Sequence, residues 1–363
     1  MSVEKKSLID SLKERKRKGE LIPLTATFEL THACNLRCCH CYLENCQAGG
    51  DELTTDQWRS CIDQAVDLGA YFAAFTGGEI FMRSDFLEIA RHALKRGVFF
   101  GLQTNATRID EPMADAIRDL HPTIVETSLY GASAQSHDGI TKVSGSFAKT
   151  IAAIEMLRKR EIKVGIKTTV MSANRDQVRQ IRKIAEDLGA AYSADPIVMP
   201  GTFGSRESIS YRMNDVEYRD YMISEGWGNV PGKEVEDLVR DKDRPDRRVL
   251  CTSAKKRFAI SPRGDVIPCV IWRHSCGNLL QQDLEAIWHG EEMSRLRQMK
   301  FEDLKQCMTC DTYGSCLRCA GLAEMETGDY LGCPSESRRM SCILGEIRRE
   351  YGENENSYEN GQP

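Results

Sequence analysis

Three of the four cysteines in residues 34–41 constrain this chain more than any other feature. Cys34, Cys38 and Cys41 have the spacing C-x3-C-x2-C and follow the apolar, strand-like run 24–30. Three thiolates at this spacing can close on three corners of an iron–sulfur cube. Such clusters usually take four cysteine ligands, so a trio predicts one iron that binds something other than protein. Zinc, which favours paired C-x2-C units, is the alternative that remains open.

Composition limits where such a site can work. The chain has 363 residues, 41% of them hydrophobic, which predicts two domains with short appendages. It has neither an eighteen-residue apolar run nor an apolar N-terminal segment, so we expect no membrane span, no signal peptide and a cytoplasmic location. Fifteen cysteines in that reducing compartment indicate metal or redox chemistry rather than disulfides. The net charge of −5 gives no attraction to nucleic acid.

Strand-like and helix-like segments alternate along residues 24–200. Apolar or alternating stretches are short, and amphipathic stretches with helical spacing lie between them. This order predicts an α/β fold in which a parallel sheet, with helices outside, curls into a partial, TIM-like (β/α)6 barrel. We expect strands at 25–30, 71–75, 98–104, 123–128, 163–170 and 191–198, and helices at 55–68, 85–96, 111–120, 147–160 and 175–188.

The chemically unusual residues follow the ends of the expected strands, where ligands collect in parallel sheets. Two glycines, Gly77 and Gly78, allow a ligand amine to approach the backbone, and Glu79 offers a carboxylate to an ammonium group. Taken alone, these residues also match a turn and ordinary strand-end hydrogen bonding. Further polar residues stand at the ends of the third, fourth and fifth strands: Thr104, Asn105, Ser128, Lys167 and Thr168.

Cysteines become dense again after residue 250. Cys251 and Cys269 flank a predicted hairpin with its turn at 262–265, so strand pairing brings them near each other. A helix is expected at 284–288. Paired C-x2-C units then follow and are compatible with zinc as well as with clusters. The cysteines of this part are Cys307, Cys310, Cys316, Cys319, Cys333 and Cys342.

The cysteine trio, the Gly-Gly-Glu segment and the cysteine-rich C-terminal part together resemble radical S-adenosylmethionine (SAM) enzymes that carry a SPASM domain. The resemblance covers residues from about 24 to 345. It implies that Cys34, Cys38 and Cys41 hold a [4Fe–4S] cluster whose open iron chelates SAM. Contacts to SAM are implied for His40, Gly77, Gly78, Glu79, Thr104, Asn105, Ser128, Lys167 and Thr168.

The same resemblance implies two auxiliary [4Fe–4S] clusters. The second is completed by a late cysteine, for which we favour Cys342 because it leads a helix, whereas Cys333 precedes Pro334 in a turn. The first has three assigned cysteines, and whether Cys276 fills its fourth position stays open. The implied ligands are Cys251, Cys269 and Cys319 for the first cluster, and Cys307, Cys310, Cys316 and Cys342 for the second.

These features predict a charged N-terminal helix followed by two domains with a bridge between them. About twenty residues ahead of the first strand cannot hold a peptide-recognition domain, so we expect a separate protein to bind a leader peptide. The expected segments are a helix at 1–23, the barrel at 24–200, a bridge at 201–250, an α+β SPASM domain at 251–345 and a polar, disordered tail at 346–363.

The resemblance implies an oxidoreductase that cleaves SAM to a 5′-deoxyadenosyl radical, which removes a hydrogen atom from the substrate. Segment 316–329 resembles enzymes that mature ribosomally made peptides. The leading hypothesis is therefore a peptide maturase that accepts electrons from a flavodoxin or ferredoxin. A thioether is the favoured product. An iron with a vacant position can hold a substrate thiolate, and it can accept the electron that is released when the sulfur bonds to the carbon radical.

Several alternatives stay open. The product can instead be a carbon–carbon or carbon–oxygen crosslink. A protein oxidation of the sulfatase-maturase type is a further alternative, although Val270 stands where those enzymes have an acidic residue. Editing of a haem-type tetrapyrrole is compatible with every motif. A multi-cluster electron carrier is also possible, but it has no need of the Gly-Gly-Glu segment.

Overall fold

The computed structural model describes residues 10, 14, 15, 17–44, 46, 47, 49–226, 251–313 and 316–359. Its core is an eight-stranded sheet in the order β6-β5-β4-β3-β2-β1-β7-β8. Strands β1 to β6 pair in parallel, which confirms the predicted α/β partial barrel. The strands are β1 (Thr25–Glu29), β2 (Phe72–Thr76), β3 (Phe99–Thr104), β4 (Ile124–Ser128), β5 (Val164–Thr169), β6 (Ala191–Asp195), β7 (Arg257–Ile260) and β8 (Val266–Ile267).

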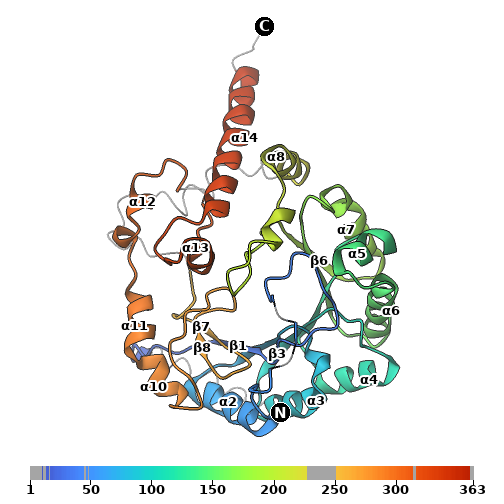
Figure 1. The fold of residues 1–363 in the computed structure, drawn as a ribbon, viewed down its shortest axis with the longest axis vertical. Helices are drawn as coiled ribbons and strands as arrows, with labels where there is room; N and C mark the ends of the chain where they lie inside the picture. Colours follow the sequence, from blue (N-terminus) through green and yellow to red (C-terminus); the bar gives the residue numbers. More distant parts are fainter. Residues whose placement is uncertain are drawn as a thin grey trace.

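Helices cover the outer face of this curved sheet (Figure 1). Helix α5 was not expected from the sequence, and the helix expected at 175–188 begins with a short 3-10 turn. The helices of this part are α2 (Thr55–Leu68), α3 (Phe86–Lys95), α4 (Glu111–Leu120), α5 (Ala134–Thr141), α6 (Ser146–Lys159) and α7 (Val178–Asp187), with 3-10 turns η1 (Ile80–Met82), η2 (Arg175–Gln177) and η3 (Ser208–Tyr211).

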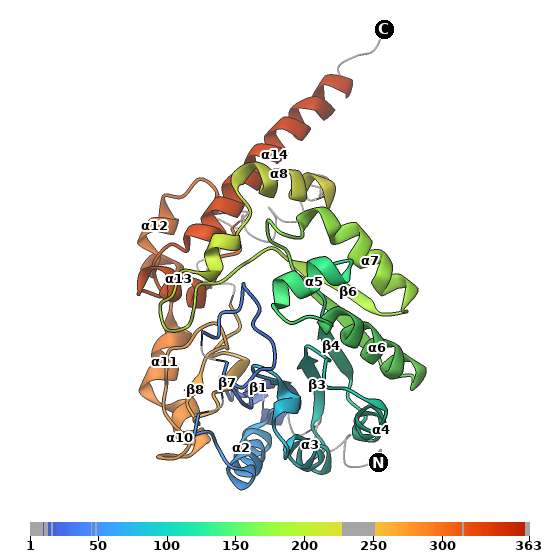
Figure 2. The same ribbon diagram turned by 45° about the vertical axis from the view of Figure 1, so that its right-hand side comes forward.

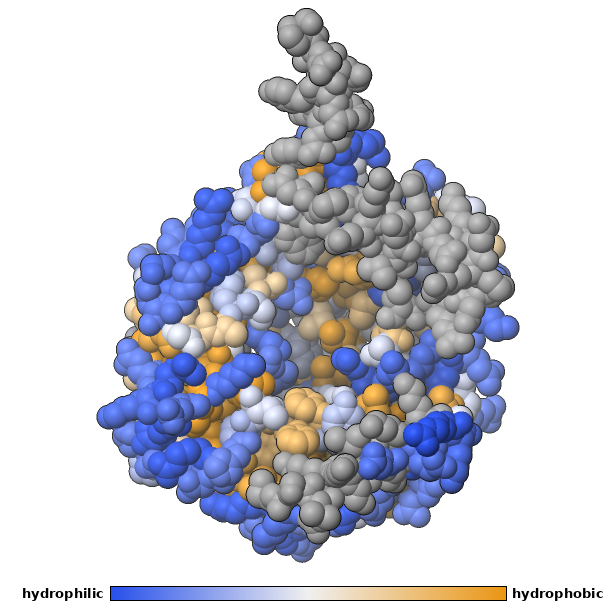
Figure 3. All heavy atoms as spheres, turned by 180° about the vertical axis from the view of Figure 1, so that it is seen from behind, coloured by the Kyte–Doolittle hydropathy of each residue, from blue (hydrophilic) through white to orange (hydrophobic). Residues whose placement is uncertain are grey.

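An aromatic layer joins the sheet to its helices. The rings of Phe28 and Phe75 on neighbouring strands stack with their centres 5.5 Å apart. Trp58 of α2 meets Phe28 edge-on, and Phe86 of α3 meets Phe75 edge-on. Side chains that alternate with these point to the other face of the sheet, which we call the inner face. The inner face borders the hollow seen from behind in Figure 3.

The C-terminal part extends the same sheet. Strand β7 pairs in parallel with β1, with Thr25 opposite Arg257, and β8 pairs antiparallel with β7. The predicted hairpin is therefore present, and it lengthens the barrel sheet. The remaining helices are α8 (Asp215–Ser224), α10 (Leu284–His289), α11 (Glu291–Gln298), the 3-10 turn η5 (Phe301–Asp303), α12 (Lys305–Met308), α13 (Ala320–Thr327) and α14 (Ser335–Glu359).

Helix α14 corrects the predicted disordered tail. It continues to Glu359 and projects away from the rest of the chain (Figures 1 and 2). Met340, Ile343, Leu344 and Ile347 have helical spacing and pack in one apolar cluster with Tyr218 of α8. This packing lies next to residue 346, where the sequence predicted that a disordered tail begins.

Some expectations lie outside the described residues. They concern most of the charged N-terminal helix, and residues 227–250 of the predicted bridge. Among the residues that are described, no helix is long and apolar enough to cross a membrane.

Candidate active site

The three cysteines of the motif lie in the loop that follows β1 and line one cavity of about 300 Å³. The backbone N–H of Cys41 donates to the carbonyl of Cys38 at 3.0 Å, which tightens the loop into a turn. Burial raises the pKa of the Cys34 thiol to about 11. Burial and the nearby negative charge of Cys34 raise the pKa of Cys38 as well. These thiols therefore need a bound cation to be thiolates at neutral pH.

In the described part of the chain, no group of three His, Cys, Asp or Glu side chains surrounds a point as the ligands of a single metal ion do. A [4Fe–4S] cube instead takes its cysteines at separate irons, so it does not require them to converge on one point.

A fourth thiol, which sequence reasoning missed, stands beside the trio. The carbonyl of Cys46 accepts a hydrogen bond from the backbone N–H of Cys34 at 3.1 Å. A hydrogen bond with the Cys41 thiol lowers the pKa of Cys46. The short spacing from Cys41 to Cys46 was visible in the sequence, but it does not belong to the C-x3-C-x2-C pattern.

The two glycines after β2 are required by the cysteine loop itself. A Cβ on Gly77 would lie 2.4 Å from the carbonyl oxygen of Thr31, and one on Gly78 would lie 2.5 Å from that of Ala33. Gly77 also has a φ of +150°, at the limit of the region that favours glycine. The Gly78 N–H donates to the Thr31 carbonyl at 2.8 Å. Both glycines line the cavity.

The carboxylate of Glu79, predicted to contact the SAM ammonium, accepts hydrogen bonds from three donors of the protein. Its side chain is buried and is absent from the described lining of the cavity. Oε1 accepts from the Thr104 hydroxyl at 2.7 Å and from the Phe81 N–H at 3.1 Å, and Oε2 accepts from the Asn105 N–H at 2.7 Å. Burial raises the pKa of Glu79, and these hydrogen bonds oppose the rise. Glu79 therefore holds the end of β3 in place.

Several other predicted residues do line the cavity. Thr104, Asn105 and Ser128 are among them, and Asn105 Nδ2 donates to the Cys34 sulfur at 3.8 Å. His40 lies against Tyr130 with ring centres 4.4 Å apart, and its Nδ1 is buried without a partner in the described residues. Burial lowers the pKa of His40 to about 4, so its ring is neutral. An unpaired nitrogen in the cavity wall fits a polar ligand.

Lys167 and Thr168, both predicted to contact SAM, point to opposite faces at the end of β5. Thr168 is buried on the helix-facing side, where its hydroxyl donates to the carbonyl of Leu129 at 2.7 Å. Lys167 is on the inner face, but its ammonium pairs with Glu126 at 2.8 Å. Neither residue is part of the described cavity wall, which Thr169 lines instead. The contact between Thr168 and SAM that the sequence predicted stays a prediction.

The cysteines assigned to the first auxiliary cluster lie together. Cys319 is the N-cap of α13, and its sulfur accepts from the Leu322 N–H at 3.4 Å. Burial and the negative charges of Cys269 and Cys251 raise the pKa of Cys319, which places the three thiols close to one another. Cys276 has charged neighbours of another kind: burial and Glu292 raise its pKa to about 12, Arg295 and Arg297 oppose the rise, and Glu324 also lies near it.

The second auxiliary group includes Cys333. Burial and the charges of Cys307, Cys333 and Cys310 raise the pKa of the Cys316 thiol to about 12. The charge of Cys333 likewise raises the pKa of Cys307. Sequence reasoning had favoured Cys342 over Cys333 as the fourth member of this group.

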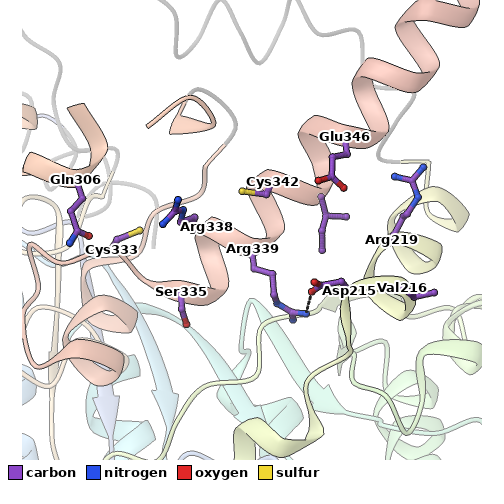
Figure 4. A pocket seen from close by; sticks show the side chains of 11 residues that line it. Asp215, Val216, Arg219, Gln306, Cys333, Ser335, Arg338, Arg339, Cys342 and Glu346 are labelled. Carbon is purple, nitrogen blue, oxygen red and sulfur yellow. Dashed lines mark hydrogen bonds and ion pairs between the residues drawn. The ribbon is translucent and has the colours of Figure 1, made fainter. Parts of the chain in front are cut away.

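Cys342 lies at the side of this group. Its sulfur is 4.0 Å from Thr312 Oγ1, which lies 3.4 Å from the Cys310 sulfur. Both Cys333 and Cys342 border a cavity of about 680 Å³ between α8 and α14, and Figure 4 shows Arg338 between them.

Comparison with known proteins decides the family. The sequence profile of the radical SAM superfamily matches residues 28–188, and that of the SPASM iron–sulfur cluster-binding domain matches residues 251–311. This chain is a radical SAM enzyme with a SPASM domain. Such domains bind [4Fe–4S] clusters and SAM, and the cysteine loop, the cavity and the unpaired nitrogen of His40 fit both.

Two relatives of this radical SAM enzyme have different activities. An AdoMet-dependent heme synthase of Methanosarcina barkeri is 28% identical over 336 residues, which make up 85% of this chain and 94% of that protein. The antilisterial bacteriocin subtilosin biosynthesis protein AlbA of Bacillus subtilis is 29% identical over 306 residues, covering 82% of this chain and 67% of AlbA.

The fold also matches a solved structure. Streptococcus suis SuiB, crystallised with the precursor peptide SuiA, aligns with a TM-score of 0.66 at 14% identity. The alignment covers 90% of this radical SAM chain and 78% of SuiB, so the two proteins share the fold.

Proposed function

We propose that this enzyme modifies a ribosomally synthesised peptide and that its product is a thioether between a substrate cysteine and a carbon atom. The likeness to the bacteriocin biosynthesis protein AlbA over 82% of the chain carries the peptide assignment. The fold shared with SuiB, whose crystal structure holds a precursor peptide, supports it. The substrate is thus a precursor peptide, and a flavodoxin or ferredoxin serves as electron donor.

Residues of this chain have defined tasks in that reaction. Cys34, Cys38 and Cys41 are the ligands of the reactive cluster, and the Gly77-Gly78 turn and Asn105 shape the wall of the SAM cavity. Glu79 positions the end of β3 without touching SAM. When bound, the cluster and SAM supply a 5′-deoxyadenosyl radical that removes a hydrogen atom from carbon.

The auxiliary sites follow from the thiol groups described above. We assign Cys251, Cys269 and Cys319 to the first auxiliary cluster, whose remaining position is open to a substrate thiol. The placement of Cys276 supports this, because its sulfur donates to the carbonyl of His274 at 3.7 Å and its charged neighbours are side chains of Glu and Arg. We assign the second cluster to Cys307, Cys310, Cys316 and Cys333.

Editing of a haem-type tetrapyrrole is the second candidate. It is favoured by the heme synthase of Methanosarcina barkeri, in which the match to this chain covers 94% of the relative. Both candidates use the same cluster and cavity, and they differ in the substrate that enters from the hollow.

One experiment separates these candidates. The reconstituted enzyme is incubated without oxygen with SAM, dithionite and the precursor peptide encoded beside its gene, and in parallel with an iron-containing tetrapyrrole. The thioether proposal expects 5′-deoxyadenosine, a peptide lighter by two hydrogen atoms and a cysteine that iodoacetamide no longer alkylates. A lighter peptide whose cysteines are all still alkylated excludes the thioether. Conversion of the tetrapyrrole alone refutes the peptide assignment.

A further inference from the structure

Charged side chains stand on the inner face of β4, β5 and β6. Along these strands they alternate with buried residues such as Val125 and Ile166, which face the helices. Glu126, Lys167 and Asp195 occupy the inner face, on three neighbouring strands. Sequence reasoning had assigned Lys167 to SAM and had not singled out the other two.

The three charges form one connected group. Lys167 Nζ lies 2.8 Å from Glu126 Oε2, and Gln103 Nε2 donates to the same oxygen at 3.0 Å. Asp195 lies near enough to Lys167 for that positive charge to lower its pKa, against the larger effect of burial, which raises it. Asp195 Oδ1 accepts from the Ile197 N–H at 2.9 Å. Within the described part of the chain, Asp195 has no ion-pair partner.

This group borders the SAM cavity. Gln103, which binds Glu126, lines the cavity. So does Ser128, the register partner of Lys167, and so does Thr169, the register partner of Asp195. A substrate carbon must lie next to this cavity to react, because hydrogen transfer needs contact between the reacting atoms. The flanking part of the substrate then meets the charged group.

The charges on these strands do not balance. Among the inner-face residues of β3 to β6, Glu126 and Asp195 are acidic and Lys167 is basic, which leaves one net negative charge. Lys167 is already committed to Glu126. The carboxylate of Asp195, an exposed residue of the inner face, thus offers an ion pair to a cation that enters the hollow.

We infer that Asp195, held beside the Glu126–Lys167 pair, is a specificity-determining residue that binds a basic side chain of the substrate peptide next to the modified residue. This inference rests on the proposed peptide-modifying function. The same residue would favour a peptide over a haem-type tetrapyrrole. The tetrapyrrole carries carboxylates, which an unpaired Asp195 would repel.

A charge-swap experiment tests the inference. The precursor peptide encoded beside the gene is prepared unchanged and with each basic residue replaced in turn by glutamate, and KM and kcat are measured for wild type, Asp195→Asn and Asp195→Lys. Asp195→Asn is expected to raise KM for the natural peptide about tenfold, the effect of losing roughly 1.4 kcal/mol of binding. Asp195→Lys is expected to convert one glutamate-bearing peptide better than the natural peptide.

A matched control variant distinguishes a failure of the Asp195 role from a failure of the peptide-modifying function. Asp187→Asn makes the same chemical change on α7, where Asp187 pairs with Lys183, and should leave KM and kcat as in wild type. If wild type converts the peptide but no basic residue shows the charge swap, the role of Asp195 is refuted and the peptide function stands. If wild type converts only the tetrapyrrole, the proposed function fails first.

Discussion

Arg273 and Glu29 form a two-point ion pair between the C-terminal part and the first strand of the barrel. Arg273 Nη1 and Nη2 donate to the two carboxylate oxygens of Glu29 at 2.5 Å and 2.7 Å. Glu29 is fully buried at the end of β1, and the guanidinium also lies over the ring of Tyr42, which follows Cys41. This pair ties the loop after the β8 hairpin to the strand that carries the reactive cysteines.

Replacing Arg273 by alanine should destabilise the enzyme by about 3 kcal/mol, because it leaves a buried carboxylate without its cation. Thermal unfolding of the reconstituted protein measures the effect. Arg263→Ala is the matched control, since Arg263 pairs with Asp51 where both side chains are more than half exposed, and we expect a loss of about 0–1 kcal/mol. Equal losses in the two variants would contradict a special role for the buried pair.

Stability should depend on pH through Glu29. Burial raises its pKa, but hydrogen bonds from His32 and Arg273 outweigh burial and lower it below its ordinary value of 4.5. The carboxylate therefore stabilises the fold above that value and loses its effect as pH falls through the folded-state pKa. The difference in unfolding free energy between wild type and Glu29→Gln should be constant above about pH 6 and should shrink as the pH falls below about 4.5 and through the folded-state pKa. A constant difference would argue against the lowered pKa.

Glu79→Ala should lower stability and, through stability, SAM affinity. It removes the acceptor for Thr104, Asn105 and Phe81, and leaving a buried donor unpaired costs about 1–3 kcal/mol. Denaturant unfolding and SAM titration are measured together, with Glu88→Gln on the exposed side of α3 as control. A Glu79→Ala protein of wild-type stability that no longer binds SAM would show that Glu79 contacts the cofactor directly.

Alanine at Cys34, Cys38 and Cys41 should abolish reductive cleavage of SAM. The cysteines after residue 250 are unchanged, so about eight of about twelve irons should stay bound if each cluster is a cube held by cysteine. Iron and sulfide analysis, Mössbauer spectra and 5′-deoxyadenosine release are the measurements. SAM cleavage at the wild-type rate would falsify the assignment of the trio.

Cys333→Ala and Cys342→Ala should differ in iron content. Cys333 lies close to Cys307 and Cys316, so its loss should remove or destabilise one cluster of about four irons. Cys342 contacts Thr312 at the edge of the group, and its replacement should leave the iron content unchanged. The reverse pattern would restore Cys342 as the ligand.

Much of the fold, and the position of several candidate site residues, could be predicted from local pattern. The expected helices at 55–68 and 111–120 have the bounds that the structure shows, because their apolar positions repeat with helical spacing. The cysteine trio, the two glycines, Asn105 and Ser128 were found at strand ends because parallel strands bring those ends to one edge. These features depend on short stretches of sequence or on strand direction alone.

Other features were decided by tertiary structure. Lys167 and Thr168 are adjacent in sequence yet point to opposite faces of β5, and one residue of register determines which of them meets the hollow. The buried position of the Glu79 side chain depends on three donors that meet at its carboxylate, one in η1, one at the end of β3 and one directly after β3. The choice between Cys333 and Cys342 depends on how α14 packs on α8, which brings together segments far apart in the chain. Spacing in a sequence carries no information about such convergence, since it arises only when the elements pack.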